Sequence, residues 1–253
     1  MSASTLAGDY LAIVTDLLHR IEREEEEHVD DAAAVLAEHV AKDQLIHVYG
    51  PGGHSNLATQ EVFFRAGGLM HVNAILDEGT LLSSGALRSM AMERLPGYGT
   101  TVVRSANLVA GDVLVLVNAY GINSALIDGA HTARDLGVTT VGVSSREHAD
   151  GTAADHLARH SSGDNLHDVV DLHIDTKVPV GDAVIEVDGV TERTGAVSTF
   201  ANAFAMNWLM MSTVEKLAER DTDPPMWRSG NAPGGDEANG RFIERFRGRV
   251  RHL

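Results

Sequence analysis

The stretch from residue 45 to residue 56 constrains the fold more than any other part of the chain. An apolar-rich run at 45–49 leads into three glycines within residues 50–53, and then into His54, Ser55 and Asn56. That order predicts a buried strand, a tight turn and the start of a helix. In a parallel α/β sheet, ligands bind at such junctions because backbone N–H groups and a helix N-terminus converge there.

A second junction of the same kind follows further along the chain. The apolar run at 112–117 gives way to the polar loop 118–124. Because the carboxyl ends of parallel strands meet at one edge of a sheet, we expect the two loops to hold one ligand between them.

Composition narrows the classes of protein. A chain of 253 residues is long enough for one α/β domain with extra helices. The net charge of −16 disfavours nucleic acid and anionic membranes as partners. The absence of cysteine excludes disulfides and thiol chemistry. With no run of 18 apolar residues and no leader pattern at the N-terminus, we expect a cytoplasmic protein.

Alternating strand and helix patterns predict a doubly wound parallel sheet. Apolar residues recur at helical spacing from 6 to 41 in two series, separated by the acidic run 23–28, and predict two packing helices there. We expect one domain, with N-terminal helices (1–42), a core (43–219) and a C-terminal arm (220–253). Strands are expected at 45–49, 70–75, 113–118, 139–144 and 169–174, helices at 56–66, 80–94, 123–136 and 198–218, and a hairpin at 184–190.

Neither glycine loop has the spacing of a nucleotide-binding motif. The loop 50–55 lacks the third glycine of a dinucleotide fingerprint and the lysine of a P-loop. The hydroxyl and amide that remain suit a sugar or a small anion. Alternatively, Ser55 or Asn56 only caps the helix.

Residues 52–58, followed by 61–69, resemble the sugar isomerase (SIS) domain family, and more narrowly its phosphoheptose-isomerase-like branch. Shorter stretches of likeness at 111–116, 181–183, 198–200 and 224–231 extend the resemblance over nearly the whole chain. The resemblance implies a three-layer α-β-α sandwich (flavodoxin-like) with a five-stranded parallel sheet. It also implies phosphosugar binding and homo-oligomers, dimers or tetramers, with sites near subunit interfaces.

The chain departs from the family pattern in the phosphate-binding loop. SIS domains usually carry Ser-x-Ser-Gly-x-Thr/Asn there, whereas Asn118 and Tyr120 occupy the two serine positions. Whether the sugar carries phosphate, another anion or none therefore stays open. The candidate substrate-binding residues are Gly53, Ser55, Asn56, Asn118, Tyr120, Gly121, Asn123 and Ser124.

The function that this pattern favours is aldose–ketose isomerisation of a phosphorylated or otherwise anionic small sugar through an enediol, which needs a base beside the reacting carbons. Glu61 is the first candidate for the base, although an ion pair with Arg65 one turn away would also explain it. His54 could move protons between oxygens, or only cap the helix. Glu93 is a reserve base that could enter a neighbouring subunit's site.

Two other functions stay open. The same domain could be a non-catalytic sensor or assembly factor that binds sugar phosphates, or a sugar lyase or etherase that uses the same base.

His156 and His160 are one helical turn apart and could hold a divalent metal, but solvated lid residues would give the same pattern. We therefore predict no metal and no cofactor.

Overall fold

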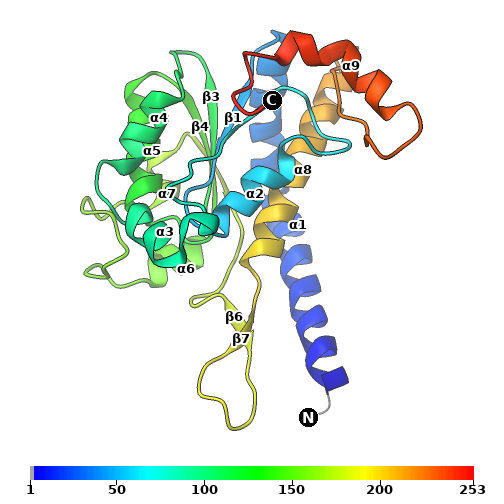
Figure 1. Ribbon diagram of the computed structural model, residues 1–253. Helices are drawn as coiled ribbons and strands as arrows, with labels where there is room; N and C mark the ends of the chain where they lie inside the picture. The colour runs from blue at the N-terminus through cyan, green and yellow to red at the C-terminus, as the bar shows by residue number, and fades with distance from the viewer. Residues whose placement is uncertain (1–2) are drawn as a thin grey trace.

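The computed structural model describes residues 3–253 and contains a five-stranded, all-parallel sheet of the order β2-β1-β3-β4-β5 (Figure 1). The predicted α/β fold is confirmed. Every strand is buried almost throughout, which explains why each appears in the sequence as a short apolar run. The strands are β1 (Ile46–Tyr49), β2 (Val72–Ile75), β3 (Val113–Val117), β4 (Thr139–Ser144) and β5 (Leu172–Asp175).

Helices cover both faces of the sheet and make the three layers visible in Figure 1. Alternate residues of β3 face opposite layers: Val113 and Val115 pack in one core, Leu114 and Leu116 in the other. The first layer contains α1 (Ala3–Ala41), α2 (Ser55–Val62) and α8 (Ser198–Ala218), and the second contains α4 (Tyr98–Ser105), α5 (Ser124–Asp135) and α7 (Leu166–Val169).

The N-terminal region differs from the prediction. Residues 3–41 form one unbroken helix, α1, and not two helices. The acidic run 23–28 contains good helix formers with neither glycine nor proline, and Glu25 within it is buried between Ile21 and Val29. The buried face therefore continues through the acidic run.

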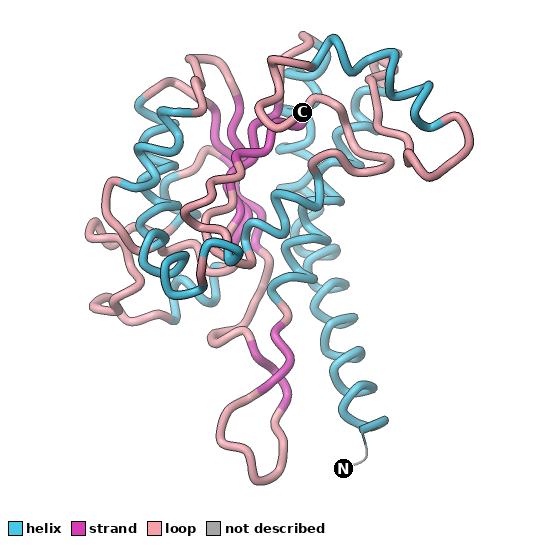
Figure 2. Tube along the Cα trace, in the orientation of Figure 1, coloured by secondary structure: helices cyan, strands magenta, loops and turns pink. Residues whose placement is uncertain are grey.

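The hairpin is present but wider than predicted. Its strands, β6 (Ala183–Ile185) and β7 (Thr194–Ala196), are antiparallel, and the predicted turn at Asp188 and Gly189 lies within the loop 186–193. Together with the N-terminal half of α1, the hairpin projects away from the sheet (Figure 2).

Other helix boundaries also differ. The helix expected at 80–94 is divided into a 3₁₀ turn, η1 (Leu82–Ser84), and α3 (Ala86–Glu93), because Gly85 lies between them with φ of +108°. Helix α2 ends at Val62, short of residue 66. Short α6 (Arg146–Gly151) follows β4, and α9 (Gly235–Phe246) lies in the C-terminal arm. Within residues 3–253, each helix is too short or too polar to cross a membrane.

Candidate functional site

The turn after β1 brings the backbone close to an acidic side chain from α3. Gly52 has φ of +107°, and a Cβ placed there would lie 2.6 Å from Glu93 Oε1. Only glycine therefore allows this approach without displacing the carboxyl group. Because Gly85 separates η1 from α3, α3 can run back toward the strand ends and end with Glu93 beside the glycine turn.

Asn118, at the end of β3, connects the two loops. Its Nδ2 lies 3.0 Å from the Pro51 carbonyl oxygen, 3.0 Å from Ser55 Oγ and 3.3 Å from Glu93 Oε1. An amide nitrogen carries two hydrogens, so three acceptors share two donors, and Glu93 has the longest contact. The strand-end site, as we define it, comprises residues 51–55, residues 118–124 and Glu93.

The Asn118 oxygen shapes its own loop. It accepts hydrogen bonds from the backbone N–H groups of Tyr120, at 2.9 Å, and Gly121, at 3.0 Å. Asn118 is only 2% exposed, so this arrangement is fixed within the protein. Gly121 has φ of +72°, and a Cβ there would lie 2.6 Å from Ser144 Oγ, so the loop packs tightly onto β4.

Glu93 has the electrostatics of an acid–base group. Burial raises the pKa of its carboxyl group to about 7, and the Asn118 hydrogen bond and the Arg94 charge only partly oppose that rise. At neutral pH, both the protonated and the ionised forms are populated. A carboxyl group with a pKa near the working pH is suited to take up and return a proton.

Tyr120 and His148 form the other side of the site. Their rings are stacked with centroids 3.8 Å apart and planes at 17°. His148 is held in the first turn of α6, where its backbone N–H group donates to Ser145 Oγ at 3.1 Å. Burial raises the pKa of Tyr120 to about 12, helped by the charges of Asp182 and Glu93, and burial lowers the pKa of His148.

Glu61 lies on the face of α2 that contacts α8. Its Oε1 is 3.3 Å from Arg65 Nε and 3.3 Å from Asn207 Nδ2 of α8. The ion pair with Arg65 that was considered as an alternative is therefore present. His54 is the N-cap residue of α2 and is exposed, and its side chain makes no capping hydrogen bond.

The other predicted site residues lie within or beside the two loops. Asn56 Nδ2 donates to the carbonyl oxygens of Gly52, at 2.9 Å, and Thr80, at 3.2 Å, so it holds the glycine turn. Asn123, the N-cap residue of α5, is 4% exposed, and its Oδ1 has no hydrogen-bond partner among the described residues. The buried Ser124 follows it, and Gly53 faces Leu82 of η1.

Two residues near the site were not singled out for it by sequence reasoning. His148 was noticed only as part of a histidine-rich segment. Asp182 lies in a turn marked by the family resemblance, where it accepts hydrogen bonds from Val197 N, Ser198 N and Ser198 Oγ at the start of α8. Periodicity could not have found either residue, because each reaches the site from a loop or short helix after a later strand.

The histidine-rich segment makes other contacts. His160 Nε2 lies 3.2 Å from Asp128 Oδ1, and His156 Nδ1 accepts a hydrogen bond from Ala158 N at 3.2 Å. Within residues 3–253, no three His, Asp or Glu side chains are grouped so that they could hold a metal ion.

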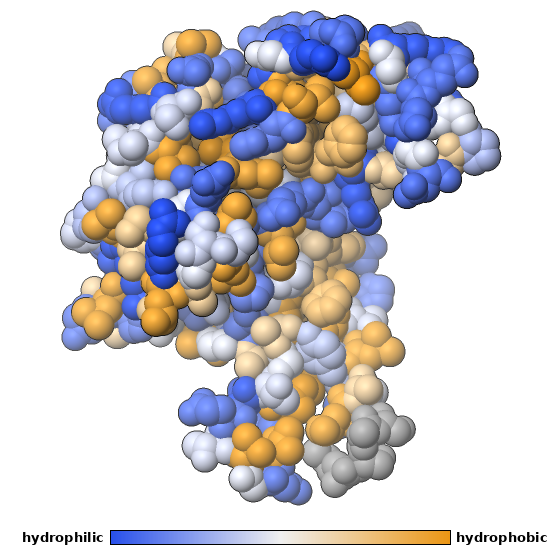
Figure 3. All heavy atoms as spheres, in the orientation of Figure 1, coloured by the Kyte–Doolittle hydropathy of each residue, from blue (hydrophilic) through white to orange (hydrophobic). Residues whose placement is uncertain are grey.

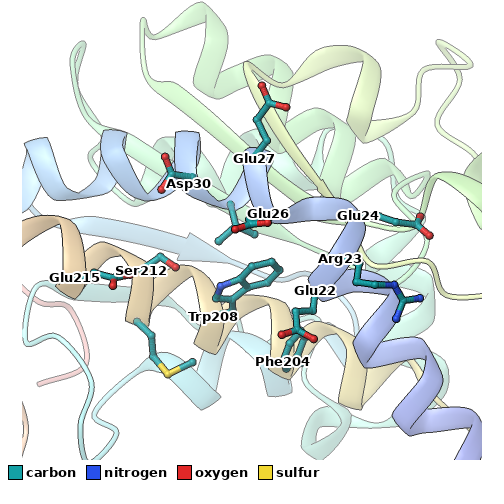
Figure 4. A pocket seen from close by; sticks show the side chains of 12 residues that line it. Glu22, Arg23, Glu24, Glu26, Glu27, Asp30, Phe204, Trp208, Ser212 and Glu215 are labelled. Atoms are coloured by element: carbon teal, nitrogen blue, oxygen red, sulfur yellow. The ribbon is translucent and has the colours of Figure 1, made fainter.

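A separate hollow of about 1080 Å³ lies between α1 and α8 (Figure 4). Trp208 occupies its centre, with Glu22 and Glu26 of α1 on one side and Ser212 of α8 on the other. Its acids are solvated: the side chain of Glu22 is 59% exposed. The strand-end site instead brings a half-buried carboxyl group next to a glycine turn and an amide donor, so we take it as the candidate functional site.

Comparisons with known proteins agree with this fold. Solved structures with a similar fold include phosphoheptose isomerase GmhA from Neisseria gonorrhoeae, with a TM-score of 0.57, 14% identity, and coverage of 85% of this chain and 100% of that one. A phosphoheptose isomerase from Francisella tularensis has a TM-score of 0.54, 12% identity, and coverage of 85% and 100%.

Sequence comparison identifies nearer relatives. A UPF0309 protein of Streptomyces griseus is 36% identical over 253 residues, which cover 99% of this chain and 98% of the relative. Residues 9–145 match the family described as the SIS domain. The predicted resemblance is confirmed, and the chain belongs to the SIS domain family.

Proposed function

We propose that the protein is an aldose–ketose isomerase that acts on a small sugar through an enediol, with Glu93 as the base. The observation that carries the proposal is the half-buried Glu93 carboxyl group, with a pKa of about 7, next to the glycine turn and the Asn118 amide. The fold shared with phosphoheptose isomerases supports the same reaction class.

In this mechanism, the Glu93 carboxylate removes a proton from the carbon next to the sugar carbonyl. Electrons of that C–H bond form the enediol double bond, and the carbonyl oxygen takes up a proton. Glu93 then returns its proton to the former carbonyl carbon, while the hydroxyl group on the neighbouring carbon loses its proton and becomes the new carbonyl. Asn118 Nδ2 and the Ser55 hydroxyl group supply the donors beside this carboxylate.

Protons must also move between the two sugar oxygens. His54 remains our candidate for this step, because it lies on the same turn as Ser55 and is exposed to an entering ligand. Glu61, which contacts Arg65 and Asn207, is proposed as a support between α2 and α8.

Solvent isotope exchange tests this proposal. The protein is incubated in D₂O with a panel of aldoses, ketoses and their phosphate esters, and deuterium at C1 and C2 is measured by NMR. We expect exchange with at least one sugar, and a loss of about 10²- to 10⁴-fold in Glu93→Gln. Glu61→Gln is the matched control and should retain the wild-type rate.

Three outcomes would change the proposal. Exchange retained in Glu93→Gln but lost in Glu61→Gln would make Glu61 the base. A sugar that binds but never exchanges would support a sensor or assembly factor, and release of water or a substituent would support a lyase or etherase.

We also propose that the chain forms a homo-oligomer through its projecting part. Hydrophobic residues lie along this projection in Figure 3; Leu11 of α1 is 67% exposed, and Phe200, which contacts Tyr10 of α1, is 48% exposed. Light scattering should give a mass that is a multiple of 27.0 kDa, and Leu11→Glu should reduce it. A wild-type mass of one chain would contradict this proposal.

A further inference from the structure

A second hollow lies at the edge of the sheet where the parallel strands begin, opposite the strand-end site. The amino-edge hollow, as we call it, has a volume of about 670 Å³ and is bounded by the starts of β1 and β3, the end of α4 and the C-terminal arm. Its lining includes His47, Asn73, Asp112 and Arg251. A ligand in this hollow would leave the strand-end site free.

Two buried polar side chains interrupt the apolar strands at this edge. His47 of β1 and Asn73 of β2 are in register, are 7% and 5% exposed, and have 3.0 Å between Asn73 Nδ2 and His47 Nδ1. Asn73 Oδ1 accepts from the Arg251 backbone N–H group at 2.9 Å, so the carboxamide nitrogen must face His47. His47 Nδ1 is therefore an acceptor, and the neutral imidazole carries its proton on Nε2.

This Nε2–H group has no hydrogen-bond acceptor among residues 3–253. Asp112 Oδ2 lies 4.0 Å away, too far for a direct hydrogen bond. Burial lowers the pKa of His47, and the Asp112 charge opposes this only in part, so the imidazole is neutral at pH 7. An oxygen about 2.8 Å from both groups can accept from His47 and donate to Asp112. A hydroxyl group has both abilities, whereas a carbonyl or carboxylate oxygen can only accept.

The C-terminal arm brings positive charge to the same hollow. Arg249 is already paired with Asp43, with 3.2 Å between its Nη1 and Asp43 Oδ2. Arg251, in contrast, forms no ion pair within residues 3–253. Guanidinium groups recognise carboxylates and phosphates through two parallel hydrogen bonds. In a chain of net charge −16, an unpaired arginine is a local attraction for an anion.

We propose that the amino-edge hollow binds a small anion that carries a hydroxyl group, with the hydroxyl group between His47 and Asp112 and the anionic group at Arg251. Hydroxy acids and phosphate esters of small polyols share this chemistry. Such a ligand would join the C-terminal arm to β1 and β3. The proposal does not depend on the isomerase function, because none of these residues belongs to the strand-end site.

Matched pairs of anions test the proposal. Calorimetric titration of the whole protein compares malate with succinate, and glycerol 3-phosphate with propyl phosphate. The members of each pair share their anionic groups, and only the first carries a hydroxyl group. We expect at least one hydroxylated anion to bind about tenfold or more tightly than its counterpart, because the hydroxyl group bonds to a charged carboxylate. Nitrogen-15 NMR should show the change at His47, with the signal assigned by its loss in His47→Gln.

An arginine variant locates the anionic group. Arg251→Gln should weaken binding of the hydroxylated anion by about tenfold or more. Arg251 is exposed, and the variant keeps the backbone N–H group that bonds to Asn73, so its fold should be unchanged. Arg241→Gln removes an exposed arginine of α9 that is paired with Glu237, and is the matched control with wild-type affinity.

Three results would overturn the proposal. Equal affinities within both pairs would show that the gap between His47 and Asp112 is not filled by a ligand hydroxyl group. Unchanged affinity in Arg251→Gln, or a His47 signal that does not move, would place the anion elsewhere, the strand-end site included. Failure of both hydroxylated anions to bind would leave the hollow without the proposed ligand class.

Discussion

Two carboxyl groups, the half-buried Glu93 and the buried Glu25, have opposite surroundings. Glu25, in the middle of α1, is 2% exposed and accepts from His28 Nδ1 at 2.9 Å and from Asp175 N at 2.9 Å. Lys177 Nζ lies 2.5 Å from Glu25 Oε1 and 3.0 Å from Asp175 Oδ2. Glu93, in contrast, meets one amide hydrogen-bond donor at 3.3 Å.

The difference supports a structural role for Glu25 and the acid–base role that we propose for Glu93. The ionic clasp, as we call Glu25, Asp175 and Lys177, attaches α1 to the end of β5. Although burial opposes this, the N–H groups of Arg146 and Lys177 and the Lys177 ammonium group hold the pKa of Asp175 below its usual value. Within residues 3–253 no lysine or arginine forms an ion pair with Glu93, so burial raises its pKa. Pairing makes one acid structural, and incomplete pairing leaves the other able to exchange a proton.

Breaking the clasp should have the largest effect on stability. In Lys177→Met, two carboxylates lose their shared cation while still buried, and the free energy of unfolding should fall by about 3–5 kcal/mol. Urea unfolding measures this change. Lys216→Met, which removes an ammonium group paired with the exposed Asp30, is the matched control and should leave the midpoint unchanged. Equal midpoints for both variants would contradict the structural role of the clasp.

Glu93 should make the free energy of unfolding depend on pH between 4.5 and 7. Its pKa is raised in the folded state, so between pH 4.5 and 7 the folded protein binds more protons than the unfolded chain. Stability should therefore fall as the pH rises through this range, by about 3 kcal/mol for a shift from 4.5 to about 7. The pKa of Asp175 is lowered from 3.8, so the stability that its ionised form contributes is lost only below pH 3.8, outside this range.

Urea unfolding at a series of pH values isolates the contribution of Glu93 to stability. Several buried histidines, His148 among them, also titrate below pH 6.5, so the difference between wild type and Glu93→Gln is the quantity to measure. That difference should grow in favour of the variant from pH 4.5 to 7 and then level off. Parallel curves would contradict the assigned pKa.

Removing Asn118 should make Glu93 still less well paired. Asn118→Ala leaves the Tyr120 and Gly121 N–H groups without their acceptor, at a cost of about 1–3 kcal/mol. It also removes the hydrogen bond that lowers the pKa of Glu93, so that pKa should rise above about 7. Carbon-13 NMR of the labelled carboxyl group measures the rise. A lower pKa of Glu93 in the variant would contradict the hydrogen bond between Asn118 and Glu93.

The sequence was sufficient for the sheet and for the two loops. Parallel strands buried on both faces appear as apolar runs, and a glycine turn or polar loop follows β1 and β3, so their pairing at one edge could be predicted. The unbroken α1 could not be predicted in this way, because the partner that buries Glu25 lies 150 residues away, at Asp175. Local periodicity contains no information on such contacts.

The position of Glu93 was hidden for a related reason. It depends on the break at Gly85, which turns α3 back toward Gly52, and a helix expected over 80–94 gives no sign of that turn. Glu61 drew attention because it follows the glycine loop in sequence. Its distance along α2 did not reveal that its carboxyl group contacts Asn207 of α8.

Glu61→Gln should have the smallest effect and decides between the two acids on α2 and α3. Its ion pair with Arg65, which lies beyond the end of α2, joins two partly exposed side chains, and such pairs stabilise proteins by about 0.2–1 kcal/mol. The amide can still bond to Asn207, so the loss in unfolding free energy should be no larger than that. Glu61, like Glu25 and unlike Glu93, is paired with a cationic side chain. The Glu61→Gln variant should therefore also keep its deuterium exchange. Loss of exchange with stability intact would place Glu61 in the reaction and would show that pairing in the free protein does not separate structural from catalytic acids.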